Sequence, residues 1–156
     1  MKDRVYVDES GINDDLKREY GRARHGARVE DCRRGRKFHR VNVVAGQIHD
    51  AAGARHLAPL CYPGTMNGER FEEWFEESLL KTVEKGKTII MDRAGFHRKK
   101  QLEEACKKHG VNLLYLPPDS PDYNPVEKTW ANMKRELRST APLHGLIETA
   151  IYAYLS

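Results

Sequence analysis

Hydrophobic and polar residues along the chain follow two different periods, and each period predicts one kind of element. Five short stretches are apolar or alternate apolar with polar residues, and they are rich in β-branched side chains, which is typical of β-strands. They are Val5–Asp8, Phe38–His49, Ala54–Tyr62, Thr88–Asp92 and Val111–Leu116. Turn residues separate the second stretch from the third, so these two are predicted to form a β-hairpin.

Four other stretches carry apolar residues at helical spacing and predict α-helices. They are the segment between the cap residue Asn67 and the stop residue Gly86, then His97–His109, Pro125–Leu137 and Pro142–Leu155. A strand and a hairpin followed by alternating helices and strands predict an α/β fold. We expect a mixed five-stranded sheet with helices on both faces.

The composition agrees with one folded domain. The chain has 156 residues, of which 39% are hydrophobic and 32% charged, which is enough apolar material for a core. It has no apolar run long enough to cross a membrane and no secretory signal, so we expect it to stay in the cytoplasm, away from the membrane. Cys32, Cys61 and Cys106 are odd in number and widely spaced, which indicates ordinary reduced thiols.

Positive charge is concentrated in one segment. The net charge is +4, and Lys17–Arg40 alone holds ten lysines and arginines against three acids. Such a segment favours contact with a polyanion, and a phosphate backbone is the usual one. A solvated loop that aids solubility is the alternative. The same segment is predicted to be irregular, with a weak strand near Ala27–Val29.

Three carboxylates stand at positions that suit a common site. Asp8 and Asp92 each end a predicted strand, and Glu127 lies at the start of a predicted helix. If the two strands are parallel neighbours, both aspartates emerge at the same edge of the sheet. Hard oxygen ligands select Mg²⁺ or Mn²⁺. Two such ions roughly 3.5 to 4 Å apart can assist an in-line displacement at phosphorus, so the chemistry implied is phosphodiester cleavage or transfer.

Glu127 also has a purely structural interpretation. Asn124, Pro125 and Glu127 suit the cap, first and third positions of a helix, and the Glu127 side chain could close a capping box with Asn124. Both interpretations stay open on the sequence.

Three segments together resemble the signature blocks of mariner-type DDE transposases of the bacterial insertion-sequence branch. They are VYVDESG, IIMDRAGFHR and LPPDSPDYNPVEKTWANMK, and the second aspartate and the glutamate are 35 positions apart, from 92 to 127. The resemblance implies a ribonuclease H-like fold of the retroviral integrase type. It also implies a catalytic, metal-binding triad of Asp8, Asp92 and Glu127 with Mg²⁺ or Mn²⁺, as two ions.

The activity that this resemblance implies is cut-and-paste DNA transposition. The ends of the element are nicked, and the 3′-hydroxyl is then transferred into target DNA. The partners implied are transposon ends and target DNA, and a homodimer, since two DNA ends must be brought together.

Two features depart from the pattern of this family. Relatives usually have Asn after the second aspartate, where this chain has Arg93. Such transposases also carry an N-terminal helix-turn-helix domain, and the chain starts directly at its first strand. It therefore resembles a single catalytic domain, residues 1–156, on its own.

Several other residues are candidates for DNA contact or for the site. The DNA-contact candidates are Arg33, Arg34, Arg36, Lys37, Arg93, His97 and Lys128. His97 could equally serve as a local hydrogen-bonding group. Glu9 should point to the sheet face opposite Asp8, as a surface or ion-paired acid. Two other functions compete with transposition: a ribonuclease H-like nuclease, and a catalytically inactive remnant that binds DNA or oligomerises.

Overall fold

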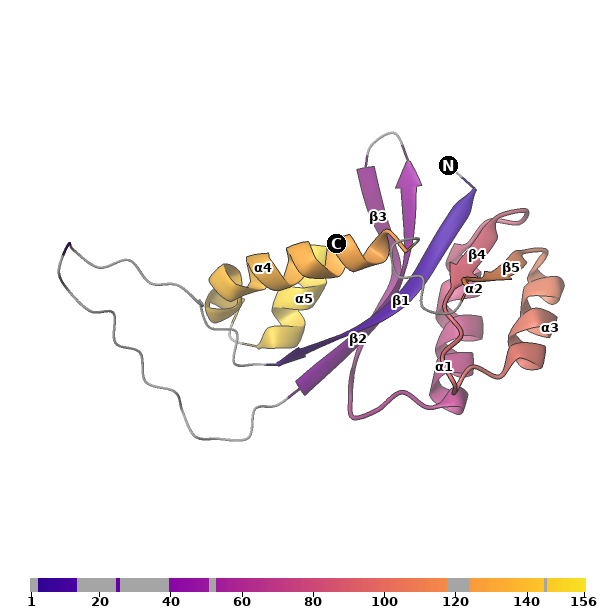
Figure 1. Ribbon diagram of the computed structural model, residues 1–156, viewed down its shortest axis with the longest axis horizontal. Helices are drawn as coiled ribbons and strands as arrows, with labels where there is room; N and C mark the ends of the chain where they lie inside the picture. Colours follow the sequence, from indigo (N-terminus) through magenta and orange to yellow (C-terminus); the bar gives the residue numbers. More distant parts are fainter. Residues whose placement is uncertain (1–2, 14–24, 26–39, 51–52, 118–123, 145) are drawn as a thin grey trace.

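A mixed sheet of five strands organises the protein (Figure 1). The computed structural model describes residues 3–13, 25, 40–50, 53–117, 124–144 and 146–156. The strands are β1 (Arg4–Asn13), β2 (Arg40–Asp50), β3 (Gly53–Pro63), β4 (Thr88–Met91) and β5 (Asn112–Tyr115). Their order across the sheet is β3-β2-β1-β4-β5. The weak strand predicted near Ala27–Val29 and the basic segment before Arg40 lie outside the described residues.

The pairing of the strands matches the predicted mixed sheet. β1 is antiparallel to β2 and parallel to β4, and β5 continues the parallel part beside β4. β2 and β3 form the predicted hairpin. The expected end of the first strand at Asp8 was wrong, because β1 continues to Asn13. Its second half pairs with the first half of β2, up to Asn13 opposite Arg40, and these ladder hydrogen bonds outweigh the turn preference of the residues after Asp8.

One face of the sheet is covered by the helices that follow β3 and β4. They are α1 (Gly68–Trp74), the π-helical turn η1 (Phe75–Leu79), α2 (Leu80–Thr82) and α3 (Lys99–His109). Asn67 caps α1, since its side chain accepts from the backbone N–H of Arg70 at 2.9 Å. Gly110 ends α3 in the left-handed conformation, with φ at 69°, as glycine readily does.

The first helix differs from the continuous one that was predicted up to Gly86. It contains the π-helical turn and ends at Thr82, and Val83 is already extended. A π-helical turn holds one extra residue and so rotates everything after it. This rotation lets both Leu79 and Leu80 face the core, where they are 0% and 2% exposed.

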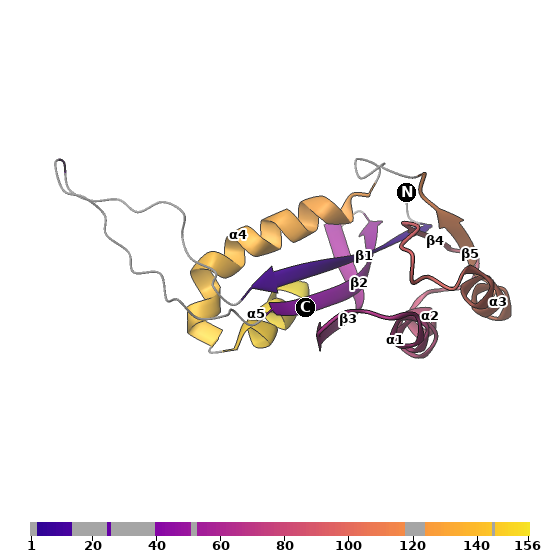
Figure 2. The ribbon, with the colours of Figure 1, turned by 60° about the horizontal axis from the view of Figure 1, so that its bottom comes forward.

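The other face of the sheet is covered by α4 (Val126–His144) and α5 (Ile147–Leu155). α4 lies along β1 (Figure 2). Its buried side chains pack on the apolar side chains of β1, β2 and β4; they are Val126, Trp130, Met133 and Leu137. The predicted end of this helix at Leu137 was wrong, since α4 continues past Pro142, a residue that costs a helix one hydrogen bond without forcing it to end.

The helical layers and the cysteines were also predicted from the sequence. Helices on both faces are confirmed. Cys61 and Cys106 are free thiols, and burial raises their pKa values to about 11 and about 12. Cys32 lies outside the described residues. Within the described ranges, each helix is too short or too polar to cross a bilayer.

We expect the packing of α4 on the sheet to dominate stability. Leu137 is 1% exposed in this contact, whereas Leu114 on β5 is 53% exposed. Leu137→Ala should lower the free energy of unfolding by about 2–5 kcal/mol, and the same truncation at Leu114 by about 0.5 kcal/mol or less. Urea unfolding of the two variants measures both values. Equal losses would contradict the assigned burial of α4.

Candidate active site

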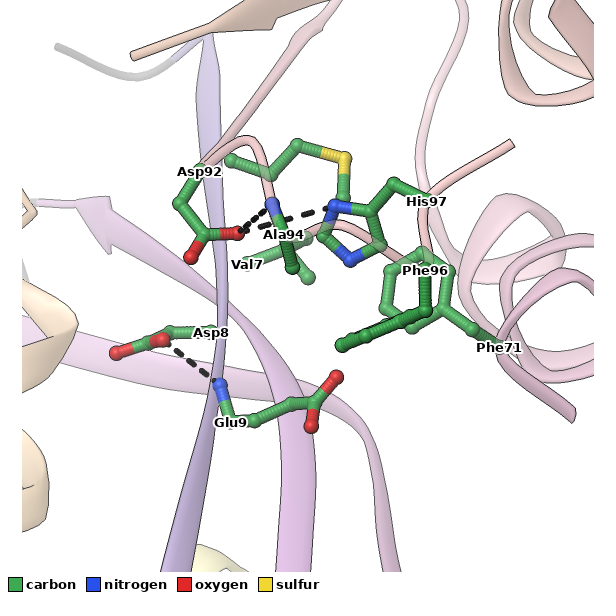
Figure 3. A pocket seen from close by; sticks show the side chains of 9 residues that line it. Val7, Asp8, Glu9, Phe71, Asp92, Ala94, Phe96 and His97 are labelled. Carbon is green, nitrogen blue, oxygen red and sulfur yellow. Dashed lines mark hydrogen bonds and ion pairs between the residues drawn. The ribbon is translucent and has the colours of Figure 1, made fainter. Parts of the chain in front are cut away.

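The two predicted aspartates emerge side by side from the middle of the sheet. Tyr6 on β1 pairs with Ile90 on the parallel strand β4, and Asp8 and Asp92 each follow two residues later. The expectation that the first and fourth predicted strands are neighbours is therefore confirmed. Asp8 remains inside β1, whereas Asp92 begins the loop after β4. Both residues line one pocket, together with Glu9 and His97 (Figure 3).

Asp8 is held firmly by two donors. Its Oδ1 accepts from the backbone N–H of Glu9 at 2.8 Å, and its Oδ2 accepts from the indole Nε1–H of Trp130 at 3.1 Å. Trp130 comes from α4 and is buried. The indole therefore links the helix that carries Glu127 to the first aspartate.

Burial and neighbouring negative charges make Asp8 hard to ionise. Its pKa rises from 3.8 to about 6, chiefly because the carboxyl group is buried, and the charges of Asp92 and Glu127 raise it further. The two hydrogen bonds from Glu9 and Trp130 act in the opposite direction. Two other carboxylates, from the loop after β4 and from α4, thus act on Asp8, which is typical of a functional site.

Asp92 is the exposed member of the pair. Its side chain is 64% exposed. Its Oδ1 accepts from the backbone N–H of Ala94 at 3.3 Å and lies 3.8 Å from Nδ1 of His97. The carboxylate is therefore weakly held and open to a ligand.

Glu127 lies in the first turn of α4 and is exposed. Asn124 caps this helix, since its Oδ1 accepts from the backbone N–H of Val126 at 3.3 Å. Among the described residues, the Glu127 carboxylate makes no hydrogen bond to Asn124, so only the asparagine half of the capping box is formed. The carboxylate of Glu127 remains available, and its charge reaches Asp8.

The donor atoms of this site suit a hard divalent cation. Asp8 and Asp92 supply carboxylate oxygens from neighbouring strands, and their mutual repulsion is relieved when a cation lies between them. In the part of the chain that the structure describes, no three acidic, histidine or cysteine side chains are grouped closely enough to hold an ion together. The three-residue metal site of Asp8, Asp92 and Glu127 therefore stays a prediction.

Glu9 is more buried than a surface acid and has a hydrogen-bond partner. It lies on the sheet face opposite Asp8, as expected, but it is half-buried, and its Oε2 accepts from the hydroxyl of Tyr62 at 2.8 Å. Burial raises the pKa of Glu9. The sequence could have predicted the burial of Glu9, because strand alternation places it on the same face as Val5 and Val7, which belong to the core.

The candidates for DNA contact are only partly described. Arg93 and Lys128 are exposed next to Asp92 and Glu127. His97 is different, since its side chain is only 3% exposed, and burial lowers its pKa and keeps the ring neutral at pH 7. The other candidates lie outside the described residues; they are Arg33, Arg34, Arg36 and Lys37. Contact of these seven residues with DNA stays a prediction.

Lys134 is a cation of α4 that lies near the acidic residues. The structure places it on α4, half-buried. Burial lowers its pKa first, the charge of Arg40 lowers it further, and the charge of Asp8 raises it. The charge of Asp8 thus acts on this half-buried lysine of α4.

Comparisons with known proteins match nearly the whole chain. The family model described as DDE superfamily endonuclease matches residues 3–148. An uncharacterized protein, y4pE/y4sA, from Sinorhizobium fredii (strain NBRC 101917 / NGR234) is 32% identical over 84 residues, which cover 53% of this chain and 56% of that protein. The chain thus spans about half the length of this curated relative.

The similar solved structures include complexes of the Mos1 transposase. The Mos1 strand transfer complex has a TM-score of 0.66 at 14% identity, with 87% of this chain and 41% of that chain covered. The Mos1 mariner paired end complex with Mn has a TM-score of 0.62 at 17% identity, with 87% and 42% covered. The catalytic core domain of BIV integrase has a TM-score of 0.58 at 12% identity, with 99% and 82% covered. The predicted ribonuclease H-like, integrase-type fold is confirmed.

The raised pKa of Asp8 predicts how stability depends on pH without metal. The folded protein keeps a proton on Asp8 up to about pH 6, whereas the unfolded chain loses it near the ordinary pKa of 3.8. The stability that protonated Asp8 contributes is fully present below pH 3.8, and it is lost as the pH rises through about 6. The free energy of unfolding of the wild type should therefore fall by about 2 kcal/mol more than that of Asp8→Asn between pH 4 and 7.

Chemical denaturation at a series of pH values measures this difference. Asp3→Asn is the control, since Asp3 is exposed, and its curve should run parallel to that of the wild type. If the Asp8→Asn curve is also parallel, the proposed cost of ionising Asp8 is wrong.

Proposed function

Because the chain belongs to the DDE superfamily endonucleases, whose family model spans residues 3–148, we propose that it is the catalytic domain of a DNA transposase. Family membership also confirms the resemblance to DDE enzymes that the three motifs indicated. The observation that carries the proposal is the convergence of charge at Asp8. Burial raises its pKa most, and the charges of Asp92 after β4 and of Glu127 at the start of α4 raise it further, to about 6.

The proposed cofactor is Mg²⁺ or Mn²⁺, bound as two ions. Asp8 and Asp92 would hold them from the two strands, and Glu127 from α4. When bound, such ions activate a water or a 3′-hydroxyl and stabilise the leaving oxygen at phosphorus. The printed description of one similar structure, a Mos1 mariner complex, includes Mn, which supports this choice of metal.

The residues around the acids would orient them for this role. The backbone N–H of Glu9 and the indole of Trp130 each occupy one oxygen of Asp8, so the direction of the remaining lone pairs is set. Gln47 on β2 exchanges two hydrogen bonds with the hydroxyl of Thr129, at 2.8 and 3.2 Å. This part-buried pair links α4 to the sheet two residues after Glu127.

The proposed substrate is DNA, first as transposon ends and then as target. The net charge of +4 favours a polyanion, and Arg93 and Lys128 place exposed cations beside Asp92 and Glu127. The similar Mos1 structures are described as a paired-end complex with the left transposon end and as a strand transfer complex. We propose that two copies of this chain act together on two ends, in the cytoplasm.

Removal of any one of the three carboxylates should abolish nicking. The variants are Asp8→Asn, Asp92→Asn and Glu127→Gln, with the exposed Glu104→Gln on α3 as the control. Each of the three should lower the rate of Mn²⁺-dependent nicking of a supercoiled plasmid by about 100-fold or more, because the loss of a metal ligand exceeds the 10- to 100-fold typical of an outer-shell change. Glu104→Gln should act like the wild type.

Calorimetric titration of Mn²⁺ into the same variants checks the binding step separately. Binding should be lost in Asp92→Asn and kept in Glu104→Gln. Wild-type nicking in any one of the three variants would contradict the triad. Absence of Mn²⁺ binding by the wild type, even with DNA present, would favour an inactive DNA-binding remnant instead.

A further inference from the structure

The ring of His97 is fixed by its surroundings in a way that a simple DNA-contact residue would not need. The imidazole packs against Phe71 with 4.4 Å between ring centroids and against Phe96 with 4.5 Å. The backbone N–H of His97 donates to the carbonyl of Ala94 at 3.1 Å, which closes the loop after Asp92. The ring therefore has little freedom to turn outward to solvent.

Both nitrogens of this buried ring have no hydrogen-bond partner among the described residues. An unpaired buried nitrogen is costly, so such a group calls for a partner. One candidate is the side chain of Asp92, whose Oδ1 lies 3.8 Å from Nδ1. Figure 3 shows this nitrogen directed at the carboxylate. A small rotation of the exposed Asp92 side chain would shorten the distance to that of a hydrogen bond.

Glu9 lines the same pocket as His97. The pocket has a volume of about 190 Å³ and is lined by His97 and Glu9 on opposite sides (Figure 3). Glu9 is anchored by Tyr62 through Oε2, whereas its buried Oε1 has no partner among the described residues. A neutral imidazole has one N–H and one acceptor nitrogen. If Nδ1–H serves Asp92, then Nε2 is an acceptor without a donor among the described residues, as is Glu9 Oε1.

We propose that His97 is a positioning residue, which holds the carboxylate of Asp92 through Nδ1–H in the orientation that cleavage requires. The inference rests on the proposed function, but the contact itself is a property of the chain without metal. It explains why a buried imidazole stands five residues after Asp92. It also gives the weakly held Asp92 a second donor besides the backbone N–H of Ala94.

Three substitutions at His97 distinguish this role from simple packing. His97→Asn puts an amide nitrogen near the place of Nδ1, His97→Gln puts one nearer to Nε2, and His97→Phe keeps an aromatic ring against Phe71 without any N–H group. His109→Phe is the matched control, because His109 is a half-exposed histidine at the end of α3, where its Nδ1 contacts the carbonyl of Ala105. Cooperative thermal unfolding of each variant checks that it folds.

We expect His97→Phe and His97→Gln to lower both kcat of Mn²⁺-dependent nicking and the affinity for Mn²⁺ by about 10- to 100-fold. KM for DNA should stay unchanged, because the residue acts on Asp92 and not on the substrate. His97→Asn should recover most of both losses, and His109→Phe should act like the wild type. Equal losses in the Asn and Phe variants, or recovery by Gln in place of Asn, would overturn the proposal.

A second measurement needs neither metal nor DNA. Proton–nitrogen correlation spectra of the ¹⁵N-labelled histidine rings identify the tautomer of His97. We expect the Nδ1–H tautomer in the wild type and a shift toward Nε2–H in Asp92→Ala; the same tautomer in both proteins would overturn the proposal. A wild type that does not nick DNA but shows this Asp92-dependent tautomer would contradict the proposed function and support the positioning role.

Discussion

The parallel pairing of β1 with β4 is the constraint on which the rest of the structure depends. It places Asp8 and Asp92 at equal distances beyond one paired position, Tyr6 opposite Ile90. Strands that run parallel need a long crossover, and here the crossover contains the hairpin and the first helix group. The helices of that crossover, together with α3, then bury one face of the sheet, and α4 and α5 bury the other. The strands that carry the acidic pair thus lie in the middle of the sheet, between the two helical layers.

This arrangement costs stability, and the cost falls on Asp8. Its carboxyl group is largely removed from water and has two acidic neighbours, so its pKa is about 6. A chain selected for stability alone would have a neutral or apolar side chain at such a position. Two hydrogen bonds, from the Glu9 backbone and from Trp130, partly offset the penalty. Conflict of this kind between local energetics and fold is expected at functional sites.

α4 connects the core to the chemistry that we propose. One face of the helix carries the apolar residues that pack on the sheet, and its first turn carries Glu127. Trp130 serves both purposes, since it is buried in the core and donates to Asp8. The loop after β4 has a similar double function. Phe96 and His97 pack against Phe71 of α1, and the same loop carries Asp92.

The sequence by itself determined the five strands, the hairpin, most of the helices and the three acids, because these depend on periodicity, caps and the residue types of a few motifs. It could not determine where β1 ends, because the ladder to β2 continues the strand beyond Asp8. It also could not place the π-helical turn, which depends on packing of Leu79 and Leu80 against the core. Only the tertiary structure decided which polar groups meet: Glu9 with Tyr62, and Trp130 with Asp8. These partners lie 53 and 122 positions apart, and no local pattern carries information about contacts at such separations.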